Sequence, residues 1–159
     1  MRVLAVDDDP DFLDVLVQQL EEGGFEVVAV PSGKDAIKVL REEGRLGDCR
    51  FDAILLDVMM PRMSGDEVAR RIRRFRRFDN VPIILLTCVA DTRLIADSIL
   101  SGANYYVSKT TPADSMMELV HQAVSLAKSR HTSEDEVAVP PGTTQPSQAA
   151  DDQRGHPEF

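Results

Sequence analysis

Short, continuously apolar runs recur along the chain, and a segment with helical spacing follows each of them. The runs lie at residues 3–6, 27–30, 53–56, 83–86 and 106–107. A strand that is apolar on both faces must be buried on both faces, which happens when helices cover a parallel sheet from two sides. The alternation therefore predicts an α/β fold, a doubly wound five-stranded parallel sheet with helices on both faces.

Capping and stop signals predict five helices that alternate with these strands. The first begins at Asp9-Pro10 and ends at Gly23-Gly24, because proline suits the first helical position and glycine the C-terminal cap. The others begin after Ser32, at Ser64, at Asp91 and at Pro112, and the last runs toward Lys128.

The apolar pattern ends near Thr132, which divides the chain into a domain at residues 1–131 and a tail at residues 132–159. The tail contains proline, serine and glutamine, with six acidic residues against one basic residue. Such a composition cannot supply a packed core, so we expect a linker or a disordered extension.

The overall composition restricts the possible partners and compartments. A formal net charge of −9 argues against non-specific nucleic-acid binding. Cys49 and Cys88 are too few for a disulfide framework, so we expect a cytoplasmic protein with free thiols. No apolar run in the sequence approaches the length of a membrane span, and we expect neither insertion nor secretion.

Polar side chains follow four of the five apolar runs. Asp7-Asp8, Asp57, Thr87 and Lys109 each come at or just after the end of a predicted strand. Parallel strands bring their carboxyl ends to one edge of the sheet, so these residues are expected to meet there. Such a set is what a phosphoryl-accepting site needs.

The motifs around these residues have a joint spacing that is far more specific than any one of them. They read Val-Asp-Asp-Asp-Pro at 6–10, Leu-Leu-Asp-Val-Met-Met-Pro-Arg-Met-Ser-Gly at 55–65, Leu-Leu-Thr at 85–87 and Ser-Gly-Ala-Asn-Tyr-Tyr-Val-Ser-Lys at 101–109. Over roughly residues 1–130 the chain closely resembles the receiver domain of bacterial two-component response regulators, of the chemotaxis-receiver kind. This resemblance implies a flavodoxin-like sheet with strand order 2-1-3-4-5.

The resemblance also implies a phosphoacceptor and a metal site. Asp57 matches the residue whose carboxylate attacks a phosphohistidine and becomes an acyl phosphate. Asp8 matches the direct Mg²⁺ ligand, Asp7 is expected to hold the metal through water, and the backbone carbonyl of Met59 completes the protein ligands.

Three further residues match the family's switch. Lys109 would offset the negative charge of the crowded carboxylates and of the incoming phosphoryl group. Thr87 would donate its hydroxyl to a phosphoryl oxygen, and Tyr106 matches an aromatic ring that rotates into the space Thr87 leaves. The signal would pass to the surface formed by the fourth helix, the fifth strand and the fifth helix as a population shift.

The implied partners are a sensor histidine kinase or a histidine phosphotransfer protein, together with a downstream protein target. The chain is then a signalling phosphoacceptor that catalyses only its own phosphorylation and dephosphorylation. Two alternatives stay open, a phosphorylation-independent binding module and the amino-terminal receiver of a longer protein with an output domain. A haloacid-dehalogenase-like phosphatase would need a second Asp two residues after the nucleophile, where this chain has Met59.

Simpler interpretations exist for each site residue. The acidic run at residues 7–9 alone would be an ordinary solvated turn with a helix cap, and Asp9 is expected to be that cap. Thr87 would then only satisfy a strand end, and Tyr106 would be a static core aromatic.

Three positions set this chain apart within the family pattern. Thr110 stands where family members have a proline joined by a cis peptide bond, and a cis bond before a non-proline residue costs about 3 kcal/mol. Met59 and Val89 occupy positions that tune the lifetime of the acyl phosphate. Neither side chain can orient an attacking water, so we expect a long-lived phosphorylated state.

The predicted third helix runs through Phe78 and is rich in arginine. At helical spacing Arg70, Arg73, Arg74 and Arg77 share its outward face. This face is interpreted either as a solvated surface that balances an acidic domain or as a basic docking strip for an acidic partner or nucleic acid.

Overall fold

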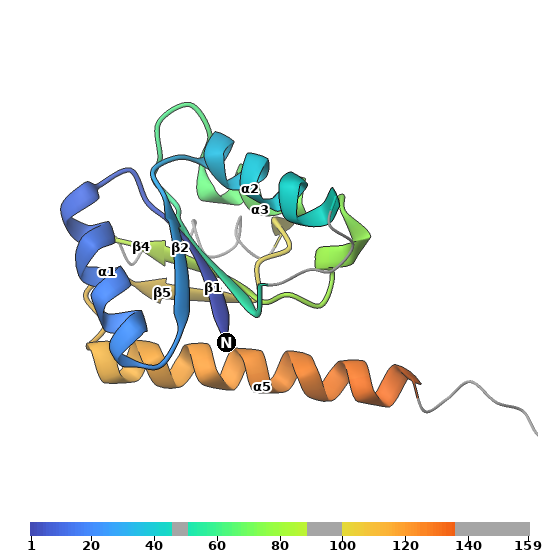
Figure 1. Ribbon diagram of the computed structural model, residues 1–159. Helices are drawn as coiled ribbons and strands as arrows, with labels where there is room; N and C mark the ends of the chain where they lie inside the picture. Colours follow the sequence, from blue (N-terminus) through green and yellow to red (C-terminus); the bar gives the residue numbers. More distant parts are fainter. Residues whose placement is uncertain (46–50, 89–99, 136–159) are drawn as a thin grey trace, which may run out of the picture.

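The computed structural model describes residues 1–45, 51–88 and 100–135 of the chain. Cys49, Val89, most of the helix predicted from Asp91, and the tail from residue 136 lie outside these residues. The described residues form one sheet of five parallel strands with helices on both faces (Figure 1).

The sheet has the predicted strand order, β2-β1-β3-β4-β5. Its strands are β1 (Arg2–Val6), β2 (Glu26–Val30), β3 (Ala53–Asp57), β4 (Ile83–Thr87) and β5 (Tyr105–Ser108). The order reverses direction between β1 and β3, and ligands of doubly wound sheets bind at the carboxyl ends of strands at such a reversal.

In the part of the chain that the structure describes, four helices and one short 3₁₀ helix cover the sheet. They are α1 (Pro10–Glu22), α2 (Gly33–Arg45), α3 (Gly65–Ile72), η1 (Arg76–Phe78) and α5 (Ala113–Asp135). Helices α2 and α3 lie together on one face, and α1 and α5 lie on the other (Figure 1). None of the helices in the described residues is both long enough and apolar enough to span a membrane.

Local capping explains where the helices begin. The carboxylate of Asp9 accepts hydrogen bonds from the backbone N–H groups of Asp11 and Phe12, which makes it the N-cap of α1 as predicted. The hydroxyl of Ser64 accepts from the N–H of Glu67 and caps α3. Gly24, with φ +83°, ends the turn after α1 in a conformation that glycine adopts at little cost.

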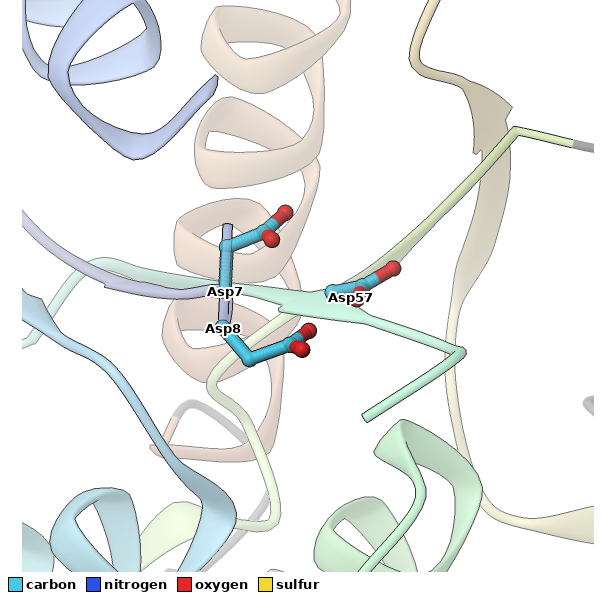
Figure 2. Close-up of side chains that lie close together, drawn as sticks. All are labelled: Asp7, Asp8 and Asp57. Atoms are coloured by element: carbon cyan, nitrogen blue, oxygen red, sulfur yellow. The ribbon is translucent and has the colours of Figure 1, made fainter. Parts of the chain in front are cut away.

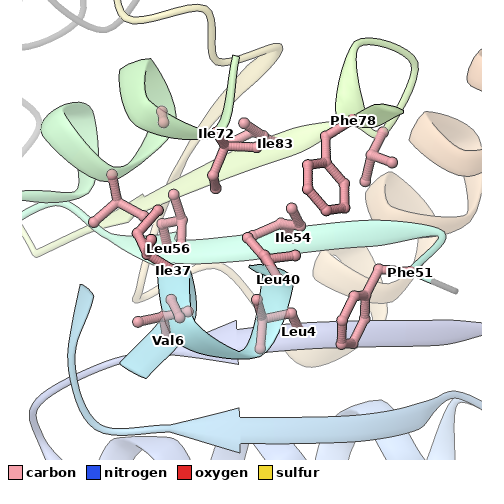
Figure 3. Close-up of a cluster of buried hydrophobic side chains, with 14 of the residues drawn as sticks. Leu4, Val6, Ile37, Leu40, Phe51, Ile54, Leu56, Ile72, Phe78 and Ile83 are labelled. Carbon is pink, nitrogen blue, oxygen red and sulfur yellow. The ribbon is translucent and has the colours of Figure 1, made fainter. Parts of the chain in front are cut away.

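Two apolar layers sandwich the sheet, because alternate strand residues point to opposite faces. On one side the cluster joins Leu4, Ile54, Leu56 and Ile83 to side chains of α2, α3 and η1 (Figure 3). On the other side Val3, Ala5, Leu55 and Leu86 pack against α1 and α5. This double burial explains why the three inner strands β1, β3 and β4 are apolar at nearly every position, whereas the edge strand β2 is only partly buried.

The third helix is shorter than predicted, and one of its arginines was placed on the wrong face. Helix α3 ends at Ile72, and Arg77 belongs to the separate turn η1. The half-buried Arg73 turns inward, and its guanidinium donates to the carbonyl oxygens of Gly102 (2.9 Å), Phe78 (2.5 Å) and Val81 (3.0 Å). It also donates to the side-chain oxygen of Asn104 at 2.8 Å, so Arg73 fastens loops at the amino edge of the sheet.

The last helix is longer than predicted. Helix α5 continues past Lys128 to Asp135 and thus crosses the expected boundary at residues 131 and 132 by a few residues. Helical hydrogen bonding can extend through a polar sequence once a packed stretch has nucleated it.

Candidate functional site

The four polar segments meet at the carboxyl edge of the sheet. Asp7 and Asp8 directly follow β1, Asp57 is the last residue of β3, and Thr87 is the last residue of β4. Lys109 directly follows β5, and its backbone N–H donates to the carbonyl oxygen of Thr87 at 2.7 Å. In the parallel register Val6 pairs with Leu56 and Thr87 with Ser108, so the strands end at a common level.

Three carboxylates cluster at the β1–β3 reversal. One oxygen from each of Asp7, Asp8 and Asp57 lies within 4.8 Å of the others. Figure 2 shows these side chains close together at the ends of the two strands. Asp7 and Asp57 are buried, at 0% and 3% exposed, while Asp8 is open to solvent. The cluster therefore has a buried base and one accessible side.

Lys109 reaches into this cluster and contacts both buried acids. Its ammonium nitrogen lies 2.6 Å from Oδ2 of Asp7 and 3.2 Å from Oδ1 of Asp57. Burial alone would lower the pKa of Lys109, but the hydrogen bond to Asp7 and the attraction of Asp57 outweigh it, so its pKa is raised. The ammonium group is held in its charged form between two carboxylates.

One ammonium group does not neutralise the cluster. The pKa of Asp57 is raised, first because burial disfavours its charged form and then because the charge of Asp7 repels it. Lys109 and the backbone N–H of Met59, which lies 3.3 Å from Oδ1 of Asp57, offset only part of this effect. The site thus retains an unmet demand for positive charge.

The backbone around Asp57 depends on a glycine. A Cβ on Gly65 would lie 2.3 Å from the carbonyl oxygen of Asp57, and the N–H of Gly65 donates to the carbonyl of Val58 at 3.1 Å. A glycine at position 65 therefore allows this loop to approach the end of β3 closely.

Sequence reasoning missed one residue at the site. The ring of Phe12 lies under the ammonium of Lys109, with 4.5 Å between Nζ and the ring centroid. Such a cation–π contact favours the charged amine and restrains its position. The sequence gives no signal for this role of Phe12, because helical spacing does not distinguish a core aromatic from one beside a lysine.

The remaining predicted residues differ in exposure. Thr87 is buried at 1% exposed, and Tyr106 is half-buried beside the α2–α3 core cluster. The side chain of Met59 is 67% exposed at the mouth of the site. The switching motion of Thr87 and Tyr106 and the ligand role of the Met59 carbonyl stay predictions.

The loop after β5 is held without a proline. The peptide bond between Lys109 and Thr110 is trans. The hydroxyl groups of Ser108 and Thr110 lie 2.7 Å apart, and the N–H of Thr110 donates to the Ser108 hydroxyl at 3.2 Å. These local bonds fix the loop while Lys109 still reaches both acids.

The donor set of the site fits a hard divalent cation. It offers carboxylate oxygens from Asp7, Asp8 and Asp57, one of them exposed, and oxygen ligands are those that Mg²⁺ prefers. A dication would also meet the electrostatic demand that leaves Asp57 with a raised pKa.

Comparison with solved structures and curated proteins places this geometry in a family. The fold matches the BeF3-activated N-terminal receiver domain of Klebsiella pneumoniae RstA, with a TM-score of 0.69, 27% identity and coverage of 78% of this chain and 97% of that one. It also matches the signal receiver domain of a Luxo repressor protein from Vibrio parahaemolyticus, with a TM-score of 0.72, 25% identity and coverage of 84% and 96%.

Among curated proteins, the transcriptional regulatory protein AfsQ1 of Streptomyces coelicolor is 41% identical over 107 residues, which is 67% of this chain and 44% of that protein. The chain spans less than half the length of the first curated relatives it matches. The family model for the response regulator receiver domain matches residues 3–121. The chain therefore belongs to the response regulator receiver domain family.

Proposed function

We propose that this receiver is a Mg²⁺-dependent phosphoacceptor switch in which Asp57 takes a phosphoryl group from a histidine kinase or a histidine phosphotransfer protein. The observation that carries the proposal is the buried Asp57 carboxylate, which lies 3.2 Å from the Lys109 ammonium and within 4.8 Å of two further carboxylates. Cytoplasmic location is part of the same proposal.

The reaction joins an Asp57 oxygen to phosphorus. As the new O–P bond forms, the P–N bond of the phosphohistidine breaks, and the histidine nitrogen keeps the electron pair. Lys109 lies where its ammonium can stabilise negative charge on the phosphoryl oxygens. The buried hydroxyl of Thr87, at the end of the neighbouring strand, would donate a hydrogen bond to one of these oxygens.

The acidic cluster has a second task in this proposal. Asp7, Asp8, Asp57 and the backbone carbonyl of Met59 would hold a Mg²⁺ ion, which supplies positive charge to the phosphoryl oxygens. The backbone N–H of Asp9 donates to Oδ1 of Asp7 at 2.9 Å. This hydrogen bond limits the rotation of the Asp7 carboxylate.

The output would pass through Thr87 and Tyr106. Phosphorylation would draw Thr87 toward the site and let the half-buried Tyr106 ring move inward. Thr87 lies on β4 and Tyr106 on the neighbouring edge strand β5, so a downstream protein would read the surface of the fourth helix, β5 and α5. The chain would have no substrate besides its phosphoryl donor and itself, and thus acts as a signalling module rather than an enzyme of metabolism.

Acetyl phosphate tests the proposal without any cognate kinase. Wild-type protein should gain one phosphoryl group in the presence of Mg²⁺ and almost none when the metal is chelated, as measured by intact-protein mass spectrometry. Asp57→Asn should gain none under either condition. Asp14→Asn, a change on helix α1 away from the cluster, is the matched control and should behave as wild type.

Equal labelling of wild type and Asp57→Asn would reject Asp57 as the acceptor. Equal labelling with and without Mg²⁺ would reject the metal requirement and leave the acceptor assignment standing.

A further inference from the structure

A groove of about 470 Å³ lies between α2 and α3, on the opposite face of the sheet from α1 and α5. Four arginines line it, Arg41 from α2, Arg70 and Arg71 from the end of α3, and Arg74 from the turn that follows. All four side chains are exposed. We refer to this feature as the α2–α3 groove, and it takes no part in the acidic site.

The positive charge of this groove is largely unmatched. Arg71 lies 2.6 Å from the carboxylate of Glu67, the one acidic residue among the lining residues. Arg70 donates to the carbonyl oxygen of Asp66, at 3.3 Å. Within the described part of the chain, no carboxylate makes an ion pair with Arg41, Arg70 or Arg74. Exposed guanidinium groups without a carboxylate partner can form bidentate hydrogen bonds with the carboxylates of a ligand.

Apolar side chains lie among the arginines. Ile37 of α2 is almost buried, and the half-buried ring of Phe75 packs edge-on against Phe78 with 6.3 Å between the ring centroids. The groove can therefore receive apolar side chains between its charged groups.

A second hollow of about 650 Å³ extends the charged surface along α2. It shares Arg41 and Arg71 with the α2–α3 groove and adds Lys34, Lys38 and Arg45. Asp35 and Glu42 lie in the same hollow, so its net charge is less one-sided. The two hollows together make an elongated surface, which suits an extended or helical chain segment better than a compact small molecule.

We propose that the α2–α3 groove binds an acidic segment of a separate protein, and that this segment also carries apolar side chains. Carboxylates would meet Arg41, Arg70 and Arg74, and apolar side chains would cover Ile37 and Phe75. A nucleic acid is disfavoured because its backbone extends beyond the groove and brings many phosphates against the rest of a chain with net charge −9. A short peptide has few charges, and at physiological salt it feels mainly those within about 8 Å.

Fluorescence anisotropy with the full chain tests this proposal. The probe is a fluorescein-labelled peptide of alternating Glu and Leu pairs, compared with the same peptide carrying Gln for Glu and with an oligothymidine of equal formal charge. The Glu–Leu peptide should bind most tightly. Arg41→Gln combined with Arg74→Gln should weaken its binding roughly tenfold, because two charge-assisted contacts are lost.

The matched control combines Arg76→Gln with Arg130→Gln, which removes the same charge from exposed positions outside the groove. Its affinity for the Glu–Leu peptide should stay close to that of wild type. Equal weakening by both double variants, tighter binding of the oligothymidine, or no binding of the Glu–Leu peptide would each overturn the proposal. If the peptide bound only to a chain that lacks residues 136–159, those residues would be the occupant of the groove. This result would overturn the proposal of a separate protein partner. None of these outcomes bears on phosphorylation of Asp57.

Discussion

Strand β3 has an aspartate at each end, and the two carboxyl groups differ in what surrounds them. Asp52, just before the strand, accepts from the N–H of Arg2 at 2.7 Å and lies 2.9 Å from the ammonium of Lys128. Burial opposes ionisation, but these two partners outweigh it, so the pKa of Asp52 is lowered. Asp57, at the other end, shares Lys109 with Asp7 and has a raised pKa.

Two partly buried cations repeat the contrast. Arg73, at the amino edge of the sheet, donates to four neutral oxygens, and burial lowers its pKa although the charge of Asp79 opposes this. Lys109, at the carboxyl edge, faces two carboxylates and has a raised pKa. Polar groups with satisfied partners hold the fold at one edge. At the other edge an excess of negative charge is kept in place, and this excess is what a metal ion and a phosphoryl group can use.

Replacing the site cation should give the largest effect. In Lys109→Met the phosphorylation of Asp57 by acetyl phosphate should slow roughly 100-fold, because a preorganised positive charge at the transferring group is lost. Rapid-quench sampling followed by mass spectrometry would measure the rate. A rate within a factor of about three of wild type would remove Lys109 from the mechanism.

Replacing the structural cation should affect stability instead. Arg73→Met leaves three backbone carbonyls without their donor and should lower the free energy of unfolding by about 2 kcal/mol. The neighbouring exposed Arg74→Met should change it by less than about 0.5 kcal/mol. Urea unfolding checks both. If folded Arg73→Met protein were phosphorylated more slowly than wild type, Arg73 would not have a purely structural role, and the contrast with Lys109 would fail.

The two aspartates of β3 should respond to substitution with opposite signs, each on the order of 1 kcal/mol, in metal-free buffer at neutral pH. The pKa of Asp52 is lower in the folded protein than in the unfolded chain. The ionised carboxylate therefore stabilises the fold at pH values above the unfolded pKa, and this stabilisation is lost as pH falls through the folded pKa. Asp52→Asn should therefore destabilise the protein at neutral pH. If Asp52→Asn and Asp57→Asn changed the free energy of unfolding in the same direction, the comparison between the two aspartates would be contradicted.

At Asp57 the folded pKa lies above the unfolded value, so the ionised group costs stability at neutral pH. This cost disappears as pH falls through the folded pKa. Asp57→Asn should therefore stabilise the protein at neutral pH and lose this advantage in acid. Thermal unfolding across a pH series would record both trends.

Removing the ring beside Lys109 should give the smallest effect. Phe12→Leu keeps an apolar side chain on α1 but removes a cation–π contact worth about 0.5–1 kcal/mol. The phosphorylation rate should fall two- to fivefold, while Phe25→Leu, which is remote from Lys109, should leave the rate of folded protein unchanged. A greater loss of rate in the Phe25 variant would show that general packing is responsible.

The sequence predicted most of the layered fold because continuous apolar strands and capping residues act locally. The strand order was implied by the resemblance and is confirmed. The end of α3 and the inward turn of Arg73 were not predictable, since the carbonyl groups that bind this guanidinium come from residues 78, 81 and 102. Helical spacing carries no information about such distant partners.

At the site, the convergence of Asp7, Asp8, Asp57 and Lys109 could be predicted because parallel strands align their ends. The trans peptide bond at Lys109 and its support by Ser108 and Thr110 could not, because they depend on side-chain hydrogen bonds within one loop.

Chemical identification of the phosphorylated residue tests the central claim most directly. After treatment with acetyl phosphate and Mg²⁺, borohydride reduction converts an aspartyl phosphate into homoserine, which peptide mass spectrometry locates. The unsatisfied charge around Asp57 predicts homoserine at residue 57 alone. Homoserine at Asp7, Asp8 or Asp52, or none in a protein that has taken up phosphate, would contradict it.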